Sequence, residues 1–266
     1  MDLNKVLYVS QEIEPYLPAT PLSTFGRALP QAMQEKGAEV RTFMPKYGNI
    51  NERRNQLHEV IRLSGINIDI DNTDHPLLIK VATLQPSRLQ VYFIDNDDYF
   101  MRHASGKLET EHDAANNDER AMFFVRGTAE TVRKLRWEPS VVHTAGWLTA
   151  LTPVYLKTVY ADDIVFRNTK VVYSLAGDSF EGQQNPALKD KLVQDGIPAA
   201  ALKAIENGID FISLNKLAID HADAIAVSSE NVVPELLDYA RASGKPLLEY
   251  PGAENMQAYI DFYTTL

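Results

Sequence analysis

The first part of the chain alternates between apolar and amphipathic runs in the order of a parallel α/β sheet. Residues 5–9 (KVLYV) are mostly apolar, which predicts a buried strand. Apolar side chains then recur at spacings of three and four, which predicts a helix that ends near Gly37. They are Leu22, Phe25, Leu29 and Met33. Because another strand pattern follows at residues 40–44, this segment is typical of a strand–helix–strand unit in a parallel sheet.

Residues 58–94 have a different pattern, with the runs HEVIRLSGINIDI, LLIKVATL and LQVYFID separated by Gly, Asn, Asp and Pro turns. Short runs with such separators are typical of hairpin strands, here inserted in or added to the sheet. The polar stretch 103–119 is expected to be a loop.

The second half of the chain returns to the alternation of strands and helices. Apolar runs predict buried strands at 140–143, 170–175 and 223–229. Amphipathic runs predict helices at 121–135, 147–160, 212–222, 230–242 and 255–266. Ser228 or Ser229 is expected to cap the 230–242 helix. We expect one α/β domain over residues 1–266, a Rossmann-like, mostly parallel sheet flanked by helices with an inserted β-hairpin region, and a tail at 244–266 that holds the C-terminal helix.

The composition narrows the choice of partners and compartment. The chain has 26 basic and 36 acidic residues and a net charge of −10, so we expect neither nucleic acid nor membrane as a partner. The lack of cysteine excludes disulfides, thiolate zinc sites and thiol catalysis. The first apolar run is too short for a signal peptide, and no stretch approaches roughly 18 apolar residues. We therefore expect a cytoplasmic protein.

The junction between the first strand and the first helix is where glycine-rich loops hold phosphate in nucleotide-binding α/β proteins. Here it reads SQEIEPYLPATPLSTFGRALP, with Pro18-Ala19-Thr20-Pro21 in the turn. Proline lacks the backbone N–H, and a β-carbon limits close approach to phosphate. The chain also lacks the G-x-x-x-x-G-K-S/T, G-x-G-x-x-G and G-x-S-x-G motifs, and we expect no cofactor.

The polar stretch 103–119 also contains residue types that bind metals. They are His103, Glu109, Glu111, His112 and Asp113. Their spacing matches no standard set of ligands, so we interpret the stretch as a solvated acidic loop and expect no metal site.

Several polar residues follow predicted strands, at the edge where open α/β sheets bind ligands. His143 ends a predicted strand and Trp147 follows at a helix start, although a buried, hydrogen-bonded histidine and a core tryptophan are an equal alternative. Glu12, Asp178 and Glu181 also lie at predicted strand ends or just beyond them. Acidic groups in such a cleft favour a polyol or a cation over a phosphate.

Five segments of the chain are informative through their common order and spacing. They are KVLYVSQEIEPYLPATPLSTFGRALPQAMQEKGAEVRTFMPKYGNI, NNDERAMFF, VVHTAGWLTALTPVYLKTVY, KVVYSLAGDSFEG and ISLNKLAIDHADAIAVSSENVVPEL. In this order and spacing, from about residue 4 to 236, they resemble the N-terminal half of bacterial glycogen synthases and plant starch synthases, the family 5 glycosyltransferases. The resemblance implies the N-terminal Rossmann-like domain of a two-domain GT-B transferase. In that family the glucan acceptor lies largely against this domain, and the nucleotide-sugar donor lies mainly on the second one.

Two departures from the family pattern bear on function. Only about 30 residues follow residue 236, so we expect the donor-binding C-terminal domain to be absent. Of the family's H-x-H-D-W-H motif, the chain keeps only His143 and Trp147. The other motif positions are occupied by Ala145, Gly146 and Leu148.

Further polar positions of the family pattern are also replaced. Ala176 and Gly177 stand where the family has a His and an Asn at a strand end. Thr24 and Asn116 each stand where the family has an Asp. Asn117 matches the Asn of the family's D-N-x-E-R motif and is kept as a candidate.

The residues and the resemblance together lead to one hypothesis and two alternatives. We expect no catalytic residue and six substrate-binding candidates, Glu12, Asn117, His143, Trp147, Asp178 and Glu181. The leading hypothesis is a catalytically degenerate binding or regulatory module of glucan metabolism. It would bind α-glucan and pair with a full-length synthase or with itself. One alternative is an active ADP-glucose:α-1,4-glucan glucosyltransferase whose donor half comes from another chain. The other is a small-molecule or polyol-binding protein that uses the cleft at the strand ends.

The predicted last helix carries three aromatic residues, Tyr259, Phe262 and Tyr263. They could cover apolar surface of their own chain or form an interface with another. The family resemblance favours the first, because a C-terminal helix of the intact family packs back on the first domain.

Overall fold

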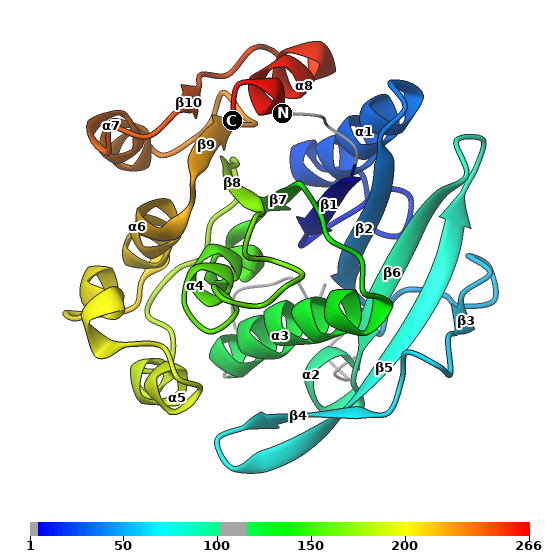
Figure 1. Ribbon diagram of the computed structural model, residues 1–266, viewed down its shortest axis with the longest axis horizontal. Coiled ribbons are helices and arrows are strands. Elements are labelled where there is room, and N and C mark those ends of the chain that lie inside the picture. The colour runs from blue at the N-terminus through cyan, green and yellow to red at the C-terminus, as the bar shows by residue number, and fades with distance from the viewer. Residues whose placement is uncertain (1–4, 102–115) are drawn as a thin grey trace.

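A single long sheet runs through the described part of the chain, residues 5–101 and 116–266 of the computed structural model (Figure 1). Its strands are β1 (Lys5–Ser10), β2 (Glu39–Pro45), β3 (His58–Glu59), β4 (Ile66–Ile70), β5 (Thr73–Leu84), β6 (Leu89–Asp95), β7 (Val141–Ala145), β8 (Lys170–Leu175), β9 (Ala224–Val227) and β10 (Leu247–Leu248). They lie in the order β10-β9-β8-β7-β1-β2-β6-β5-β3, and β4 pairs with β5. Pairing is parallel from β10 to β6 and antiparallel around β5, which confirms the predicted mostly parallel sheet with a hairpin region.

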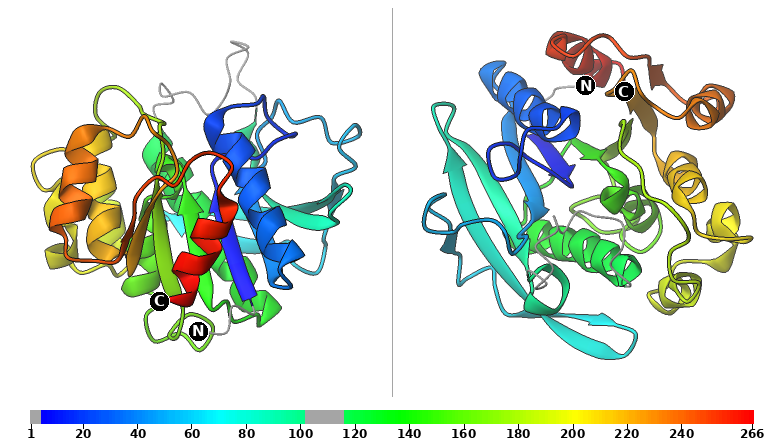
Figure 2. Two further views of the ribbon diagram at one scale, coloured as in Figure 1. Left: turned by 90° about the horizontal axis from the view of Figure 1, so that it is seen from above. Right: turned by 180° about the vertical axis from the view of Figure 1, so that it is seen from behind.

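Helices cover both faces of this sheet (Figures 1 and 2). They are α1 (Pro21–Glu35), α2 (Asp97–Phe100), α3 (Asn117–Leu135), α4 (Leu151–Lys157), α5 (Leu188–Gln194), α6 (Phe211–His221), α7 (Pro234–Ala242) and α8 (Met256–Thr264), with short 3₁₀ helices η1 (Trp147–Thr149) and η2 (Ala199–Ile205). One face is packed by α1 and α8, and the other by α3, α4 and α6. The buried strands between them form a continuous apolar core.

Helix α1 begins and ends where its sequence predicts. Thr20 caps it by accepting a hydrogen bond from the Ser23 amide at 3.0 Å, and the Ser23 hydroxyl accepts one from the Thr20 amide at 2.8 Å. Pro21 occupies the first turn, where a missing N–H costs nothing. Gly37 follows the helix at φ +94°, a conformation that glycine adopts without strain. The predicted apolar stripe from Leu22 to Met33 is buried.

Several boundaries differ from the sequence predictions. The single helix predicted at 147–160 is instead the 3₁₀ helix η1 followed by α4, which ends at Lys157. Strand β7 continues to Ala145, so His143 lies inside the strand rather than at its end, because residues 144–145 keep the parallel register with β1. The predicted serine cap of α7 was wrong, since the helix begins at Pro234 after an N-cap Val233. The predicted loop 103–119 ends earlier than expected, because Asn117 already belongs to α3; residues 102–115 lie outside the described part.

The tail adds both a strand and a helix to the fold. β10 extends the sheet beside β9, and α8 packs against α1. Tyr259 and Tyr263 are buried and Phe262 is partly buried, so the last helix covers surface of its own chain, as expected. Among the described residues, no helix combines the length and the apolar character needed to cross a membrane.

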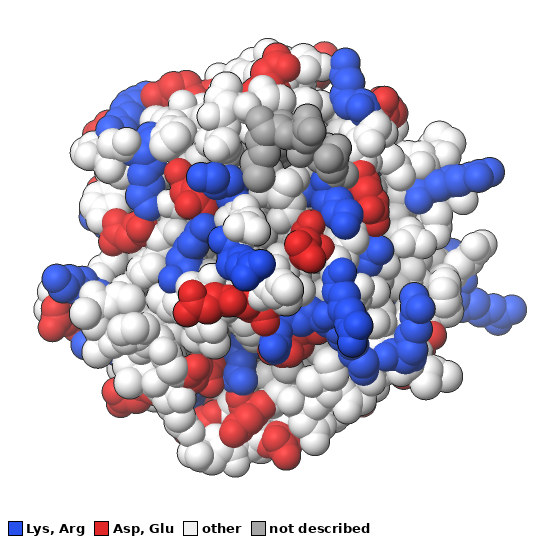
Figure 3. All heavy atoms as spheres, viewed as in Figure 1, with Lys and Arg blue, Asp and Glu red and all other residues white. Residues whose placement is uncertain are grey.

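The two edges of the sheet differ in what they carry. The start of β1 and the C-terminal residue Leu266 lie at the amino-terminal edge, whereas the loops after β1, β8 and β9 gather at the opposite edge (Figure 2). The amino-terminal edge faces the viewer in Figures 1 and 3, and basic and acidic side chains are intermixed on it. Many are paired there, as Arg133 is with Glu130 and Asp163.

Candidate functional site

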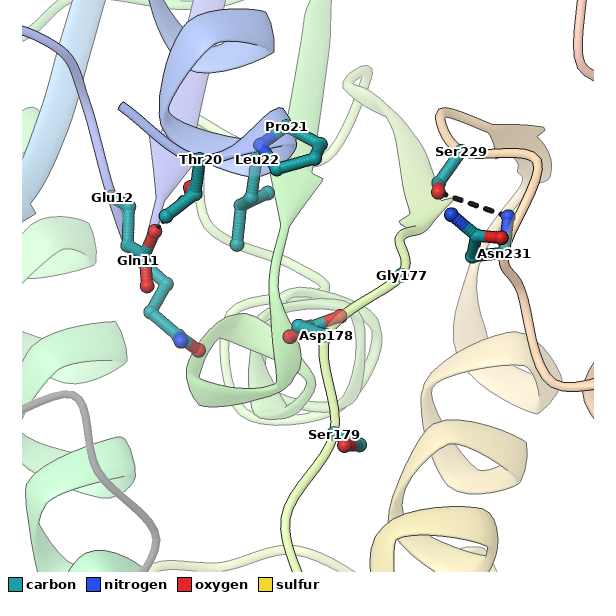
Figure 4. Close-up of a pocket in the computed structure, with 10 residues that line it drawn as sticks. All are labelled: Gln11, Glu12, Thr20, Pro21, Leu22, Gly177, Asp178, Ser179, Ser229 and Asn231. Atoms are coloured by element: carbon teal, nitrogen blue, oxygen red, sulfur yellow. Dashed lines mark hydrogen bonds between the residues drawn. The ribbon is translucent and has the colours of Figure 1, made fainter. Parts of the chain in front are cut away.

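A pocket of about 280 Å³ opens at the carboxyl-terminal edge of the sheet (Figure 4). Three loops and one helix start form its walls, because the carboxyl ends of parallel strands meet at one edge. Its lining residues are Gln11 and Glu12 after β1, Thr20, Pro21 and Leu22 at the start of α1, Gly177, Asp178 and Ser179 after β8, and Ser229 and Asn231 after β9. Hydroxyl, amide and carboxylate groups therefore dominate the polar part of this lining.

The wall formed by α1 is held by the carboxylate of Glu12. The Thr20 hydroxyl donates to Glu12 Oε2 at 2.7 Å, and the Ser10 hydroxyl donates to the Glu12 carbonyl oxygen at 2.7 Å. A Cβ on Gly26 would lie 2.5 Å from that same carbonyl oxygen, so a glycine is needed for this close packing. A helix N-terminus favours negative charge, and here the chain's own carboxylate lies beside it.

A second pair of side chains holds the turn between β7 and η1. The Trp147 amide donates to Asp178 Oδ2 at 2.7 Å, and the Leu148 amide donates to Gln11 Oε1 at 3.0 Å. Gly146 lies at φ +93°, and a Cβ there would lie 2.7 Å from the Gln11 Cβ. Two groups in the pocket lining are thus fixed by hydrogen bonds to the backbone of this turn.

The third wall depends on a close approach of the loops after β8 and β9. A Cβ on Gly177 would lie 2.7 Å from the Ser229 hydroxyl oxygen, so a larger residue there would displace the Ser229 side chain. The Ser229 hydroxyl accepts a hydrogen bond from the Asn231 amide at 3.1 Å (Figure 4). The Ser228 amide donates to the Leu175 carbonyl at 2.9 Å and continues the sheet to the pocket.

Of the six predicted binding residues, the structure brings two together in the pocket, Glu12 and Asp178. Glu181 is exposed beyond the lining. Asn117 lies buried at the start of α3, where its Oδ1 accepts a hydrogen bond from Arg120 at 2.8 Å.

His143 and Trp147 lie in the core rather than in the pocket lining. The His143 ring has no exposed surface and stacks on Tyr8 at a centroid distance of 5.1 Å. Burial lowers its pKa to about 3, so the ring is neutral at physiological pH. The Trp147 ring is 2% exposed and packs edge-on against Phe180. Of the two interpretations open from the sequence, the structure places both side chains in the core.

Charge and ligand chemistry limit what the pocket can hold. Among the described residues that line it there is no lysine, arginine or histidine. No group of three or more His, Cys, Asp or Glu side chains in the described part is placed to hold a metal. The loop residues considered as metal ligands, His103, Glu109, Glu111, His112 and Asp113, lie outside the described residues.

Sequence reasoning missed most of the polar lining, namely Gln11, Thr20, Ser179, Ser229 and Asn231. Their position after predicted strands could have identified some of these residues, since Gln11 directly follows β1 and Ser229 follows β9 by two residues. Ser228 or Ser229 was instead predicted to cap a helix, although Ser229 follows a strand end.

The fold and the pocket define a Rossmann-like α/β domain of the type found in GT-B glycosyltransferases, with a polar site at the strand ends. The sequence pattern of the family described as the starch synthase catalytic domain matches residues 5–248. The chain belongs to this family, and the resemblance predicted from its five segments is confirmed.

Individual relatives agree with this assignment. The chain is 35% identical to a glycogen synthase of Pelodictyon phaeoclathratiforme over 234 residues, which are 88% of this chain and 47% of that protein. It is 37% identical to a glycogen synthase of Chlorobium chlorochromatii over 227 residues, 85% of this chain and 46% of the relative. The chain thus spans about half the length of the curated relatives it matches.

A solved structure shares the fold. The catalytic domain of starch synthase IV from Arabidopsis thaliana, bound to ADP and acarbose, superposes with a TM-score of 0.73 at 17% identity. The alignment covers 93% of this chain and 51% of that one.

Proposed function

We propose that this chain binds α-glucan in the pocket at the carboxyl-terminal edge of its sheet and does not by itself transfer glucose from ADP-glucose. The observation that carries the proposal is the lining: carboxylate, amide and hydroxyl groups, and no cationic side chain among the described residues. Sugar hydroxyls both donate and accept hydrogen bonds, and such neutral and acidic partners suit them.

The same lining argues against the nucleotide-sugar. A diphosphate needs cationic or backbone N–H donors, both to bind and to be stabilised as it leaves. The start of α1 lies beside the Glu12 carboxylate, and the Trp147 amide already donates to Asp178. Two negative groups therefore stand where an anion would have to enter.

The proposal is tested by calorimetric titration with maltoheptaose and, separately, with ADP-glucose. We expect maltoheptaose to bind and ADP-glucose to give no heat of binding. Asn231→Ala should weaken maltoheptaose binding by about tenfold, because it removes an amide from the lining. Asn168→Ala is the matched control, since Asn168 is an exposed asparagine outside the lining, just before β8.

Three results would contradict this proposal. Binding of ADP-glucose would overturn the proposal, as would an equal effect of the two asparagine variants. If glucose or glycerol bound as tightly as maltoheptaose, the site would belong to a small-polyol-binding protein.

The partial coverage of the relatives favours a second candidate, one half of an active glucosyltransferase. The matched segment is about half of each curated glycogen synthase. This candidate predicts glucose transfer from ADP-glucose to maltoheptaose only when the remaining half of a relative is added as a separate chain. A mixture without activity, made with halves that do bind each other, would exclude it.

A further inference from the structure

Helix α8 contacts both β9 and α1 through one side chain, Tyr259. α8 lies beyond residues 5–248, the segment that matches the family. The Tyr259 side chain is 1% exposed, and its hydroxyl donates to the Val227 carbonyl oxygen at 2.7 Å. Its ring packs edge-on against Phe25 of α1, with the centroids 5.0 Å apart.

Both contacts lie within a few residues of the pocket lining. Val227 is the last residue of β9, and Ser229 and Asn231 follow it. Phe25 lies one turn after Leu22, the last of the α1 residues in the lining. Figure 4 shows these two groups on opposite sides of the pocket, with the α1 start on one side and the β9 loop on the other.

The β9 loop is also attached to β8. The Ser228 amide and hydroxyl both bond to the Leu175 carbonyl, at 2.9 and 3.1 Å, and fix the loop to β8. The Val227 carbonyl points away from that pairing and is held by Tyr259 from the α8 side. A buried carbonyl that loses its donor becomes costly, so the strand end would shift or open.

We propose that Tyr259 is a positioning residue for this pocket. It braces the β9 loop against α1, and so it fixes the distance between the two walls to which a ligand binds. The effect on ligand affinity rests on the proposed function, whereas the brace itself can be measured without any ligand.

The chain supplies a matched control on the same helix. Tyr263 is also fully buried, and its hydroxyl lies 2.6 Å from His143 Nδ1, inside the central strand β7. Tyr259→Phe and Tyr263→Phe each remove one buried hydroxyl from α8, but only the first removes a bond to the pocket wall. The two variants should lose similar amounts of thermal stability.

Hydrogen exchange on the ligand-free protein is the first test. Tyr259→Phe should raise the exchange rates of the Ser228 and Asn231 amides by about five- to tenfold relative to residues 5–9, and Tyr263→Phe should not. Equal changes of these exchange rates in the two variants, or no change in Tyr259→Phe, would contradict the proposed role of Tyr259.

Calorimetry with maltoheptaose is the second test. We expect Tyr259→Phe to weaken binding by about five- to tenfold and Tyr263→Phe to leave it within about twofold. Equal affinities in the two variants would overturn the positioning role. A wild-type chain that does not bind maltoheptaose would overturn the proposed function instead. The hydrogen-exchange experiment alone would then test whether Tyr259 holds the β9 loop in place.

Discussion

The Tyr263 hydroxyl lies 2.6 Å from His143 Nδ1, and neither side chain has any exposed surface. The two residues are 120 positions apart in the sequence. Tyr8 stacks on a face of the imidazole, and Phe25 lies next to it. The histidine that the sequence suggested as a substrate-binding candidate is thus the centre of an aromatic cluster that joins α8 to β7.

Burial of His143 should make the protein less stable as the pH falls. Its folded pKa of about 3 is below the ordinary 6.5, so below pH 6.5 the unfolded chain takes up a proton that the folded chain does not. Stability is therefore retained above pH 6.5 and lost below it, by about 2 kcal/mol between pH 7 and pH 5. Urea unfolding at both pH values measures this, and His143→Gln should lose distinctly less. An equal loss of unfolding free energy in the wild type and the variant would contradict the assignment of this pH dependence to His143.

Gly146→Ala should destabilise the protein by about 3 kcal/mol. The residue lies at φ +93°, and the new methyl group would meet the Gln11 side chain at 2.7 Å. Gly182→Ala is the control, because Gly182 also has positive φ, at +76°, but no described atom lies within 4 Å of its Cβ position. The control should cost only about 1 kcal/mol. Thermal unfolding of both variants tests whether position 146, with its strained backbone and the clash, costs more than an open position of positive φ.

Lys191→Met should cost about 3–5 kcal/mol, because it leaves two carboxylates without their cation. Lys191 Nζ lies 2.8 Å from Asp118 and 2.5 Å from Glu119. Burial opposes its charge, but the hydrogen bonds to these carboxylates prevail and raise the pKa of Lys191. Lys189→Met on the same helix should change stability by no more than about 0.5 kcal/mol. Similar chemical-unfolding midpoints for the two variants would argue against a structural role for the buried pair.

Trp147→Phe should reduce thermal stability while leaving the maltoheptaose affinity within about twofold. The indole packs against Phe180 and is absent from the pocket lining, and the backbone amide that bonds to Asp178 is kept in the variant. Asn231→Ala provides the contrast, with reduced affinity and nearly unchanged stability. A large loss of affinity in Trp147→Phe would mean that the indole reaches the ligand after all.

The sequence predicted the elements more reliably than the site. α1 followed from its apolar stripe and the glycine after its end, which are local signals, whereas its Thr20 cap was not predicted. The predicted end of β7 was two residues too early, because Thr144 and Ala145 are not strongly apolar. Only their pairing with β1 shows that they belong to the strand.

The pocket depends on contacts between distant segments, which no local pattern contains. Gly177 and Ser229 approach each other because β8 and β9 pair, and Gln11 reaches the turn after β7 across 137 positions. The sequence left the role of His143 open for the same reason, since its burial is completed by a helix near the far end of the chain. Glu12 and Asp178 could be found because a carboxylate just after a strand is visible in the sequence alone.

The arrangement of the chain ends offers a practical advantage. The start of β1 and the C-terminal residue Leu266 lie at the edge of the sheet opposite to the loops after β1, β8 and β9, which line the pocket (Figure 2). Tethering the protein to a biosensor chip through an affinity tag after Leu266 would leave the pocket facing the flowing solution. Association and dissociation rates of oligosaccharides could then be recorded on an oriented layer, without the attachment point competing for the site.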